Sequence, residues 1–249
     1  MRPGGSAAAP VGETGAVDLS ALAGTLPLLF PLAFLVLAGV AVWWTLEQAR
    51  KRREAFAAYA ASRGWTYVRE DPALVHRFTG APFGRGFGRR AQNVLLGQHD
   101  GRATIAFDYQ YSQRTGSGKN RRTSTYDFSV VATHLGVALP ELSVTPENVV
   151  SRFFGRVFDS DMQLDSEQFN RAFTVGAPDR KFAYDVLHPQ MIEMLLTRPD
   201  LAWRTEGDSL VMISSGKHSP ALVEDRLAAM DGIADRIPEF VWRQLRGQG

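Results

Sequence analysis

The chain has 249 residues, which is enough for one or two domains. Its 28 basic and 26 acidic residues nearly balance, and a formal net charge of +2 argues against a dedicated nucleic-acid-binding protein. The sequence contains no cysteine, which excludes disulfides, thiolate nucleophiles and cysteine-ligated zinc or iron–sulfur centres.

The first predicted element is a transmembrane helix over residues 20–46. No charged residue lies between Asp18 and Glu47, and about 20 apolar residues span the hydrocarbon core of a bilayer as a helix. Trp43 and Trp44 end the run, where aromatic residues commonly meet the lipid headgroups. A cleaved signal peptide has a basic start and a shorter apolar region. We therefore expect the chain to contact the lipid bilayer through residues 20–46.

Four basic residues follow the apolar run directly: Arg50, Lys51, Arg52 and Arg53. Because basic residues remain on the cytoplasmic side of a membrane helix, they predict a single-pass protein of the bacterial cell membrane with a cytoplasmic C-terminal domain. Residues 1–19, rich in Gly, Ala and Pro, are expected to be a disordered tail outside the membrane. Two interpretations of this cluster remain open. The four residues serve only as the topogenic signal, or they also bind anionic lipid headgroups.

A helical stalk is predicted over residues 47–64, because Ala, Arg, Lys and Glu favour helix and Gly64 is a suitable C-terminal stop. Residues 65–249 are expected to form an α+β domain in the cytoplasm. The stretch 65–70 (WTYVRE) has the composition of a strand, and Asp71-Pro72 is typical of the start of a short helix. The glycine-rich stretch 79–91 is expected to be a loop.

Period-two alternation predicts an antiparallel meander with one buried face over residues 91–145. Its strands are Ala91–Gln98, Arg102–Tyr111 and Thr123–Ala132, with Leu142–Thr145 as a weaker fourth strand. The Asp100-Gly101 pair is a hairpin signal.

The second half of the domain is predicted to be mainly helical, packed against the antiparallel sheet. Short helices are expected over residues 146–158, from Ser166, over 178–187 and over 189–197, with a brief strand at 174–175 and a hairpin over 201–214. A long amphipathic helix follows Ser219-Pro220, because Val223, Leu227 and Met230 begin an apolar stripe with spacings of four and three. Pro238 is expected to kink it.

Two glycine-rich segments resemble nucleotide-binding loops but lack the required spacing. Gly84, Gly86 and Gly88 give G-x-G-x-G before a strand instead of G-x-G-x-x-G before a helix, and residues 116–120 (GSGKN) lack the first glycine and the final Ser or Thr of a P-loop. Both segments are therefore predicted to be basic surface loops, with lipid headgroups or, for the first, single-stranded RNA as alternative partners. Their basic residues are Arg85, Arg89, Arg90, Arg114, Lys119, Arg121 and Arg122.

No catalytic, metal or cofactor motif is complete. The five histidines lack ligand spacing. Asp159, Asp161 and Asp165 lack the glycine and the final glutamate of a calcium loop. The G-x-S-x-G signature of a nucleophile elbow is absent. The sequence therefore predicts no metal and no cofactor, and leaves catalytic residues unknown.

Four stretches carry a family resemblance: 63–67 (RGWTY), 77–88 (RFTGAPFGRGFG), 89–97 and 169–188 (FNRAFTVGAPDRKFAYDVLH). In these the chain resembles a family of uncharacterised single-pass membrane proteins from high-GC Gram-positive bacteria, whose domain has no assigned function. The resemblance implies a membrane segment followed by this domain, and it implies no catalytic residue.

Two functional hypotheses remain. The first is a membrane-anchored binding or scaffold module that engages a partner protein or anionic lipid, with no specific nucleic-acid partner. The alternative is a membrane-tethered enzyme of the hydrolase kind, with catalytic residues dispersed in the sequence. A deep pocket with convergent titratable groups would favour the enzyme.

Overall fold

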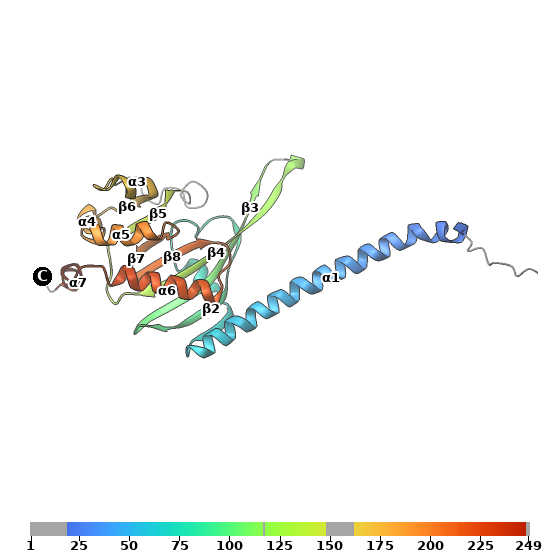
Figure 1. The fold of residues 1–249 in the computed structure, drawn as a ribbon, viewed down its shortest axis with the longest axis horizontal. Coiled ribbons are helices and arrows are strands. Elements are labelled where there is room, and N and C mark those ends of the chain that lie inside the picture. The colour runs from blue at the N-terminus through green and yellow to red at the C-terminus, as the bar shows by residue number, and fades with distance from the viewer. Residues whose placement is uncertain (1–18, 117, 148–161, 248–249) are drawn as a thin grey trace, which may run out of the picture. The chain divides into compact units, whose positions relative to one another are not determined.

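The structure is a computed structural model that describes residues 19–116, 118–147 and 162–247, without the side chains of residues 19–30, 32 and 119. The chain after Lys51 forms one compact unit built on an eight-stranded antiparallel sheet with helices (Figure 1). The predicted α+β class is thereby confirmed for this unit. The helix expected over residues 146–158 falls almost entirely outside the described residues.

One helix, α1 (Leu19–Ser62), contains both the apolar run and the expected stalk. The chain divides into two compact units between Lys51 and Arg52, so the last turns of α1 belong to the domain. Gly64 ends the helix as predicted: its φ is +67°, and the Trp65 N–H donates to the Ala60 carbonyl oxygen at 2.7 Å. Within the described part of the chain, no helix has the length and hydropathy required to span a membrane. The span predicted over residues 20–46 therefore stays a prediction.

The first four strands lie side by side in chain order: β1 (Thr66–Glu70), β2 (Phe87–His99), β3 (Arg102–Thr115) and β4 (Arg122–His134). Asp100 and Gly101 both have positive φ, at 49° and 71°, as a type I′ hairpin turn requires. The short helix after Asp71 is a 3₁₀ helix, η1 (Pro72–His76), and η2 (Gly118–Asn120) lies between β3 and β4. The prediction of a loop through residue 91 is wrong from Phe87 onward, because β2 begins there and pairs with β3.

The other four strands are β5 (Leu142–Pro146), β6 (Phe173–Gly176), β7 (Trp203–Glu206) and β8 (Ser209–Ser215). The sheet order is β1-β2-β3-β4-β8-β7-β5-β6. The fourth strand of the predicted meander exists, but its expected position is wrong, because the β7–β8 hairpin lies between β4 and β5. Residues 209–213 of β8 are all buried, which fits a strand in the interior of a sheet.

The prediction of one buried sheet face is also wrong, because each face carries its own hydrophobic core. Along β3, Ala106 belongs to the core that includes Phe56 of α1 and the helices of the second half, whereas Phe107 belongs to a core with Phe78 and Phe83 from the segment before β2. Thr104 and Asp108 alternate along β3 with the apolar residues of one face, so a single buried face would leave them in solvent, but both are buried.

Five helices complete the described domain: α3 (Glu167–Ala172), α4 (Arg180–Val186), α5 (Pro189–Thr197), α6 (Pro220–Ala234) and α7 (Glu239–Leu245). Ser166, Asp179 and Ser219 cap α3, α4 and α6 by accepting a backbone N–H with their side chains. The long helix predicted after Ser219 is two helices, because the chain breaks at Pro238 instead of kinking.

Candidate functional site

The break between α6 and α7 creates a surface groove in the domain. Pro238 has extended backbone angles (φ −61°, ψ 145°) and serves as the N-cap residue of α7. Proline has no backbone N–H, so Pro238 cannot donate the hydrogen bond that would continue α6. The segment between the two helices therefore turns, and it lines one side of a groove of about 680 Å³.

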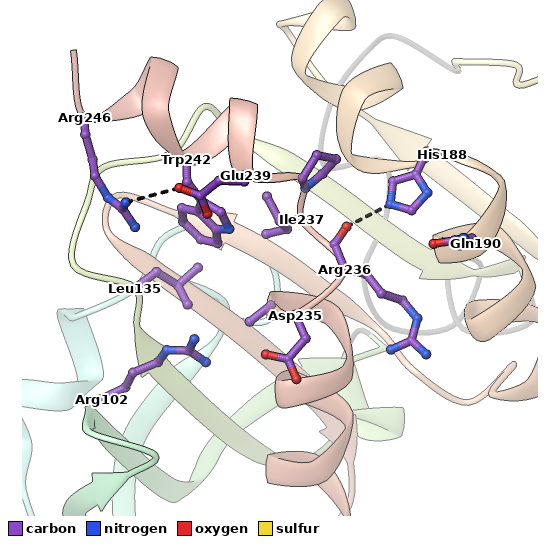
Figure 2. A pocket seen from close by; sticks show the side chains of 12 residues that line it. Arg102, Leu135, His188, Gln190, Asp235, Arg236, Ile237, Glu239, Trp242 and Arg246 are labelled. Atoms are coloured by element: carbon purple, nitrogen blue, oxygen red, sulfur yellow. Dashed lines mark hydrogen bonds and ion pairs between the residues drawn. The ribbon is translucent and has the colours of Figure 1, made fainter. Parts of the chain in front are cut away.

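Segments that are far apart in sequence line this groove (Figure 2). Arg102 comes from the start of β3, Leu135 follows β4, and His188 precedes α5. The remaining lining residues come from α5 and from the α6–α7 region: Gln190, Ala234, Asp235, Arg236, Ile237, Pro238, Glu239, Trp242 and Arg246. The volume lies in the range of small-molecule sites.

Hydrogen bonds hold several of the polar groups in place. His188 donates from Nε2 to the Arg236 carbonyl oxygen at 2.8 Å, and Arg236 donates from Nη1 to the Gly232 carbonyl oxygen at 2.8 Å. Arg246 lies 3.8 Å from the Glu239 carboxylate and over the Trp242 ring, 6.0 Å from its centroid. Figure 2 shows two of these interactions as dashed lines, the one between His188 and Arg236 and the one between Arg246 and Glu239.

This composition suits binding better than nucleophilic catalysis. The lining contains three arginines, two carboxylates and one indole ring, but no Ser, Thr, Cys, Lys or Tyr. Because a carbonyl oxygen only accepts, His188 Nε2 must carry the proton and cannot act as a base through that atom. Among the described residues, no group of histidines and carboxylates is arranged to hold a metal ion.

A second polar centre lies inside the domain, around Asp108 of β3. Only 3% of the Asp108 surface is exposed to solvent. Arg52 donates from Nη2 to Asp108 Oδ1 at 3.0 Å, and Asn93 Nδ2 donates to Asp108 Oδ2 at 2.8 Å. The backbone N–H of His218 also donates to Asp108 Oδ1, at 2.8 Å. The carboxylate therefore joins the last turns of α1 to the sheet and to the start of α6.

His218 is kept neutral beside this carboxylate. Burial lowers the pKa of His218 to about 4, and Arg52 acts in the same direction while Asp108 opposes the shift. Its Nε2 donates to the Asn93 carbonyl oxygen at 3.1 Å, whereas its buried Nδ1 has no hydrogen-bond partner among the described residues. Phe56 packs on the imidazole with ring centroids 4.5 Å apart.

Of the basic residues predicted beside the membrane, Arg50 and Lys51 are exposed and pair with Glu47, at 3.1 and 3.8 Å. Arg53 is half-buried. The expectation that the whole cluster lies at the surface is wrong for Arg52. This residue is half-buried, and its guanidinium binds the Asp108 carboxylate and the His218 carbonyl oxygen. Along the cluster, the two exposed residues therefore come first, and the two half-buried residues follow where the last turns of α1 belong to the domain.

The two predicted basic loops form one continuous feature. Phe87 of β2 pairs with Ser112 of β3, and Thr115 of β3 pairs with Arg122 of β4, so the first loop lies beside the hairpin. We call this feature the basic arm and define it by six arginines: Arg85, Arg89, Arg90, Arg114, Arg121 and Arg122. The side chain of Lys119 lies outside the described residues.

The groove and the Asp108 centre were not predicted from the sequence. His188 is the N-cap residue of α5, and its side chain makes no capping hydrogen bond to the helix. For Asp108 a signal existed, because a carboxylate stands in mid-strand between two buried aromatic residues, Phe107 and Tyr109. Its partner Arg52 lies 56 positions earlier, and no local pattern joins the two.

No family model matches this chain, and no curated protein matches it significantly. A solved structure with a similar fold is the crystal structure of the mycobacterial trehalose monomycolate transport factor A, TtfA. The two chains are 17% identical, with a TM-score of 0.55, and the match covers 76% of this chain and 97% of that chain. At this identity the likeness shows a shared fold and nothing finer.

Proposed function

We propose that this protein is a membrane-anchored, non-catalytic binding or scaffold module that engages lipid or a partner protein at the bacterial cell membrane. In this proposal, residues 20–46 of α1 anchor the chain and the α+β domain lies on the cytoplasmic side. Membership of the bacterial family that the sequence resembles is part of the same proposal.

The observation that carries the proposal is the apolar surface of α1 before the domain. Phe34, Leu37 and Trp43 are 71%, 68% and 66% exposed. With Leu35, Val36, Val40, Val42, Trp44 and Leu46, which are also exposed, they occupy every side of the helix. A helix that is apolar all round requires an apolar environment on all sides, and the following basic residues favour a cytoplasmic end.

The fold comparison supports the proposal at a coarse level. As its name states, TtfA is a trehalose monomycolate transport factor. A role at a lipid-handling membrane site is therefore compatible with this fold. The groove composition adds to this support, because its mixed charges and its indole ring suit recognition, while the lining offers no hydroxyl or thiol nucleophile for the hydrolase alternative.

Carbonate extraction of bacterial membranes tests the anchor. The full chain should remain with the membranes in alkaline carbonate and dissolve only in detergent. The double substitution Leu37→Arg with Val40→Arg should release it, because each arginine in mid-membrane costs about 2.5–3.5 kcal/mol.

Ala57→Arg with Ala58→Arg is the matched control, since these exposed positions lie on the same helix but within the domain. This variant should stay with the membranes. A wild-type chain in the soluble fraction, or equal release of both variants, would contradict the proposal.

A further inference from the structure

The basic arm concentrates positive charge in a way that the nearly neutral chain as a whole does not. Arg85, Arg90, Arg114, Arg121 and Arg122 are exposed, and Arg89 is half-buried. No Asp or Glu occurs from residue 72 to residue 99, or from 109 to 126, and these two stretches contain the whole arm. The arm therefore carries cations only.

Two carboxylates lie at the base of the arm, Asp127 and Glu70. Asp127 on β4 pairs with Gln110, and its Oδ1 accepts from Gln110 Nε2 at 2.7 Å. Glu70 is on β1, opposite Gln92, which is two positions beyond Arg90. Among the described residues, Arg89, Arg90, Arg114, Arg121 and Arg122 form no salt bridge with a carboxylate. The charge at the tip is thus available to an external anion.

The arm also presents aromatic surface next to its cations. Phe87 is 42% exposed, and the Arg114 guanidinium lies over its ring, 4.6 Å from the centroid. Beneath this surface, the half-buried Tyr126 stacks on the buried Tyr111 across β3 and β4, with ring centroids 5.3 Å apart. Figure 1 shows the β3–β4 hairpin extending beyond the other strands of the sheet. A projecting element with aromatic and basic side chains matches the interfacial region of an anionic bilayer.

We propose that the basic arm is a second membrane contact, which binds the phosphate headgroups of anionic lipids in the bilayer that anchors α1. This inference rests on the proposed anchor, because a tethered domain meets lipid headgroups at high effective concentration. An acidic protein or a nucleic acid would have to compete with that local concentration. The bilayer is therefore the partner that the chain itself brings closest.

Site-specific quenching in nanodiscs tests the proposal with the full chain. The sequence has no cysteine, so Gln113→Cys places a single fluorophore at the exposed arm and Gln244→Cys places one on α7 as a reference. Each labelled chain is reconstituted in discs of phosphatidylcholine alone or with phosphatidylglycerol, both containing a spin-labelled lipid as quencher.

We expect strong quenching at position 113 only in the anionic discs, and its loss when salt is raised from roughly 0.1 M to 1 M, where the Debye length falls from about 10 to 3 Å. Arg114→Gln with Arg121→Gln and Arg122→Gln should weaken the arm–lipid equilibrium by at least about tenfold. The control Arg180→Gln with Lys217→Gln and Arg243→Gln removes the same charge from exposed positions elsewhere and should leave the quenching unchanged.

The two proposals fail in different ways. If the chain does not enter the discs, the anchor fails, and the same labelled chain mixed with free phosphatidylglycerol vesicles still tests the arm. If the chain enters the discs but position 113 is quenched equally in neutral and anionic lipid, or equally in both triple variants, the arm proposal is overturned. Release of the quenching by RNA at sub-stoichiometric concentration would also overturn it in favour of a nucleic-acid partner.

Discussion

Asp108 is a charged residue in the interior of the sheet, and its environment explains how it is tolerated. Burial of a carboxylate is costly unless it is paired and hydrogen-bonded. Here Arg52, Asn93 and the His218 backbone supply both the charge and the donors. Such a centre favours one docking position of the last turns of α1 over others, because any shift leaves a buried ion without its partners.

We predict that Asp108→Ala lowers the free energy of unfolding by about 2–4 kcal/mol, because it leaves Arg52 and Asn93 without their acceptor. The lower half of this range is expected if Arg52, whose side chain is 29% exposed, turns to water. Urea denaturation of the full chain in detergent measures the change. Asp127→Ala removes a more exposed carboxylate from the next strand and should cost less than about 1 kcal/mol. Equal losses in the two variants would contradict the role assigned to Asp108.

His218 makes stability depend on pH in a defined window. Its pKa is about 4 in the folded protein and about 6.5 in an unfolded chain. Between these values the unfolded state binds more protons, so the free energy of unfolding falls as the pH is lowered from about 6.5 to 4, by about 3 kcal/mol in total. Above about pH 6.5 the contribution is constant.

The variant His218→Gln isolates this effect from the titration of carboxylates. Its unfolding free energy should fall less steeply with decreasing pH than that of the wild type, with the difference confined to the window between about pH 6.5 and 4. Parallel pH profiles would show that His218 titrates normally in the folded protein.

Residue-scale chemistry was the hardest to predict from the sequence. All four residues of the run 50–53 are basic, but they do not share one environment. Arg52 forms an ion pair with the buried Asp108, whereas Arg50 and Lys51 pair with Glu47 on the helix surface. Which member faces the sheet depends on how α1 docks, and that is decided by contacts more than fifty residues away in sequence.

At the scale of elements, the same glycine substitution should have opposite effects at two positions. A Cβ at Gly97 of β2 would lie 2.2 Å from the Trp65 indole, whereas at Gly232 of α6 its nearest neighbour is the tip of Arg236 at 3.6 Å. Trp65 is buried, with its Nε1 donating to the Gln98 carbonyl oxygen. It therefore cannot move without losing contacts.

We expect Gly97→Ala to destabilise the protein by about 1–3 kcal/mol through overpacking. Gly232→Ala should stabilise it by about 0.5–1 kcal/mol, because alanine loses less entropy in a helix interior. Thermal denaturation of the two variants and the wild type measures both changes in stability, which should have opposite signs. A stabilised Gly97→Ala would mean that Trp65 is free to repack.

Elements with strong local signals were predictable, and their order in the sheet was not. Alternation and the Asp100-Gly101 turn located β2, β3 and β4, and Ser219 with Pro220 located the start of α6. The insertion of β8 beside β4 depends on pairing between Val131 and Met212, which are far apart in the chain. The groove was missed for the same reason, since it forms only where the end of α6 meets the segments around Arg102 and His188.

At the scale of the whole molecule, the charge distribution predicts one orientation. A membrane-impermeant maleimide should label Gln244→Cys only in permeabilised cells, because the basic residues after the apolar run favour the cytoplasm. Ser6→Cys, in the N-terminal tail, should react in intact cells. Labelling of position 244 in intact cells would reverse the orientation.

The sheet order has a consequence for how the chain is made. β4 ends at His134, but β8, which covers its free edge, ends only at Ser215. At roughly 5–20 residues per second, the ribosome needs several seconds for the roughly 80 residues between them. During that time the nascent chain presents an unpaired strand edge that contains Phe128, Val130 and Val131, and such an edge is a template for aggregation. Chains truncated between these two points should therefore be substrates for chaperones, whereas the complete chain closes the edge with its own hairpin.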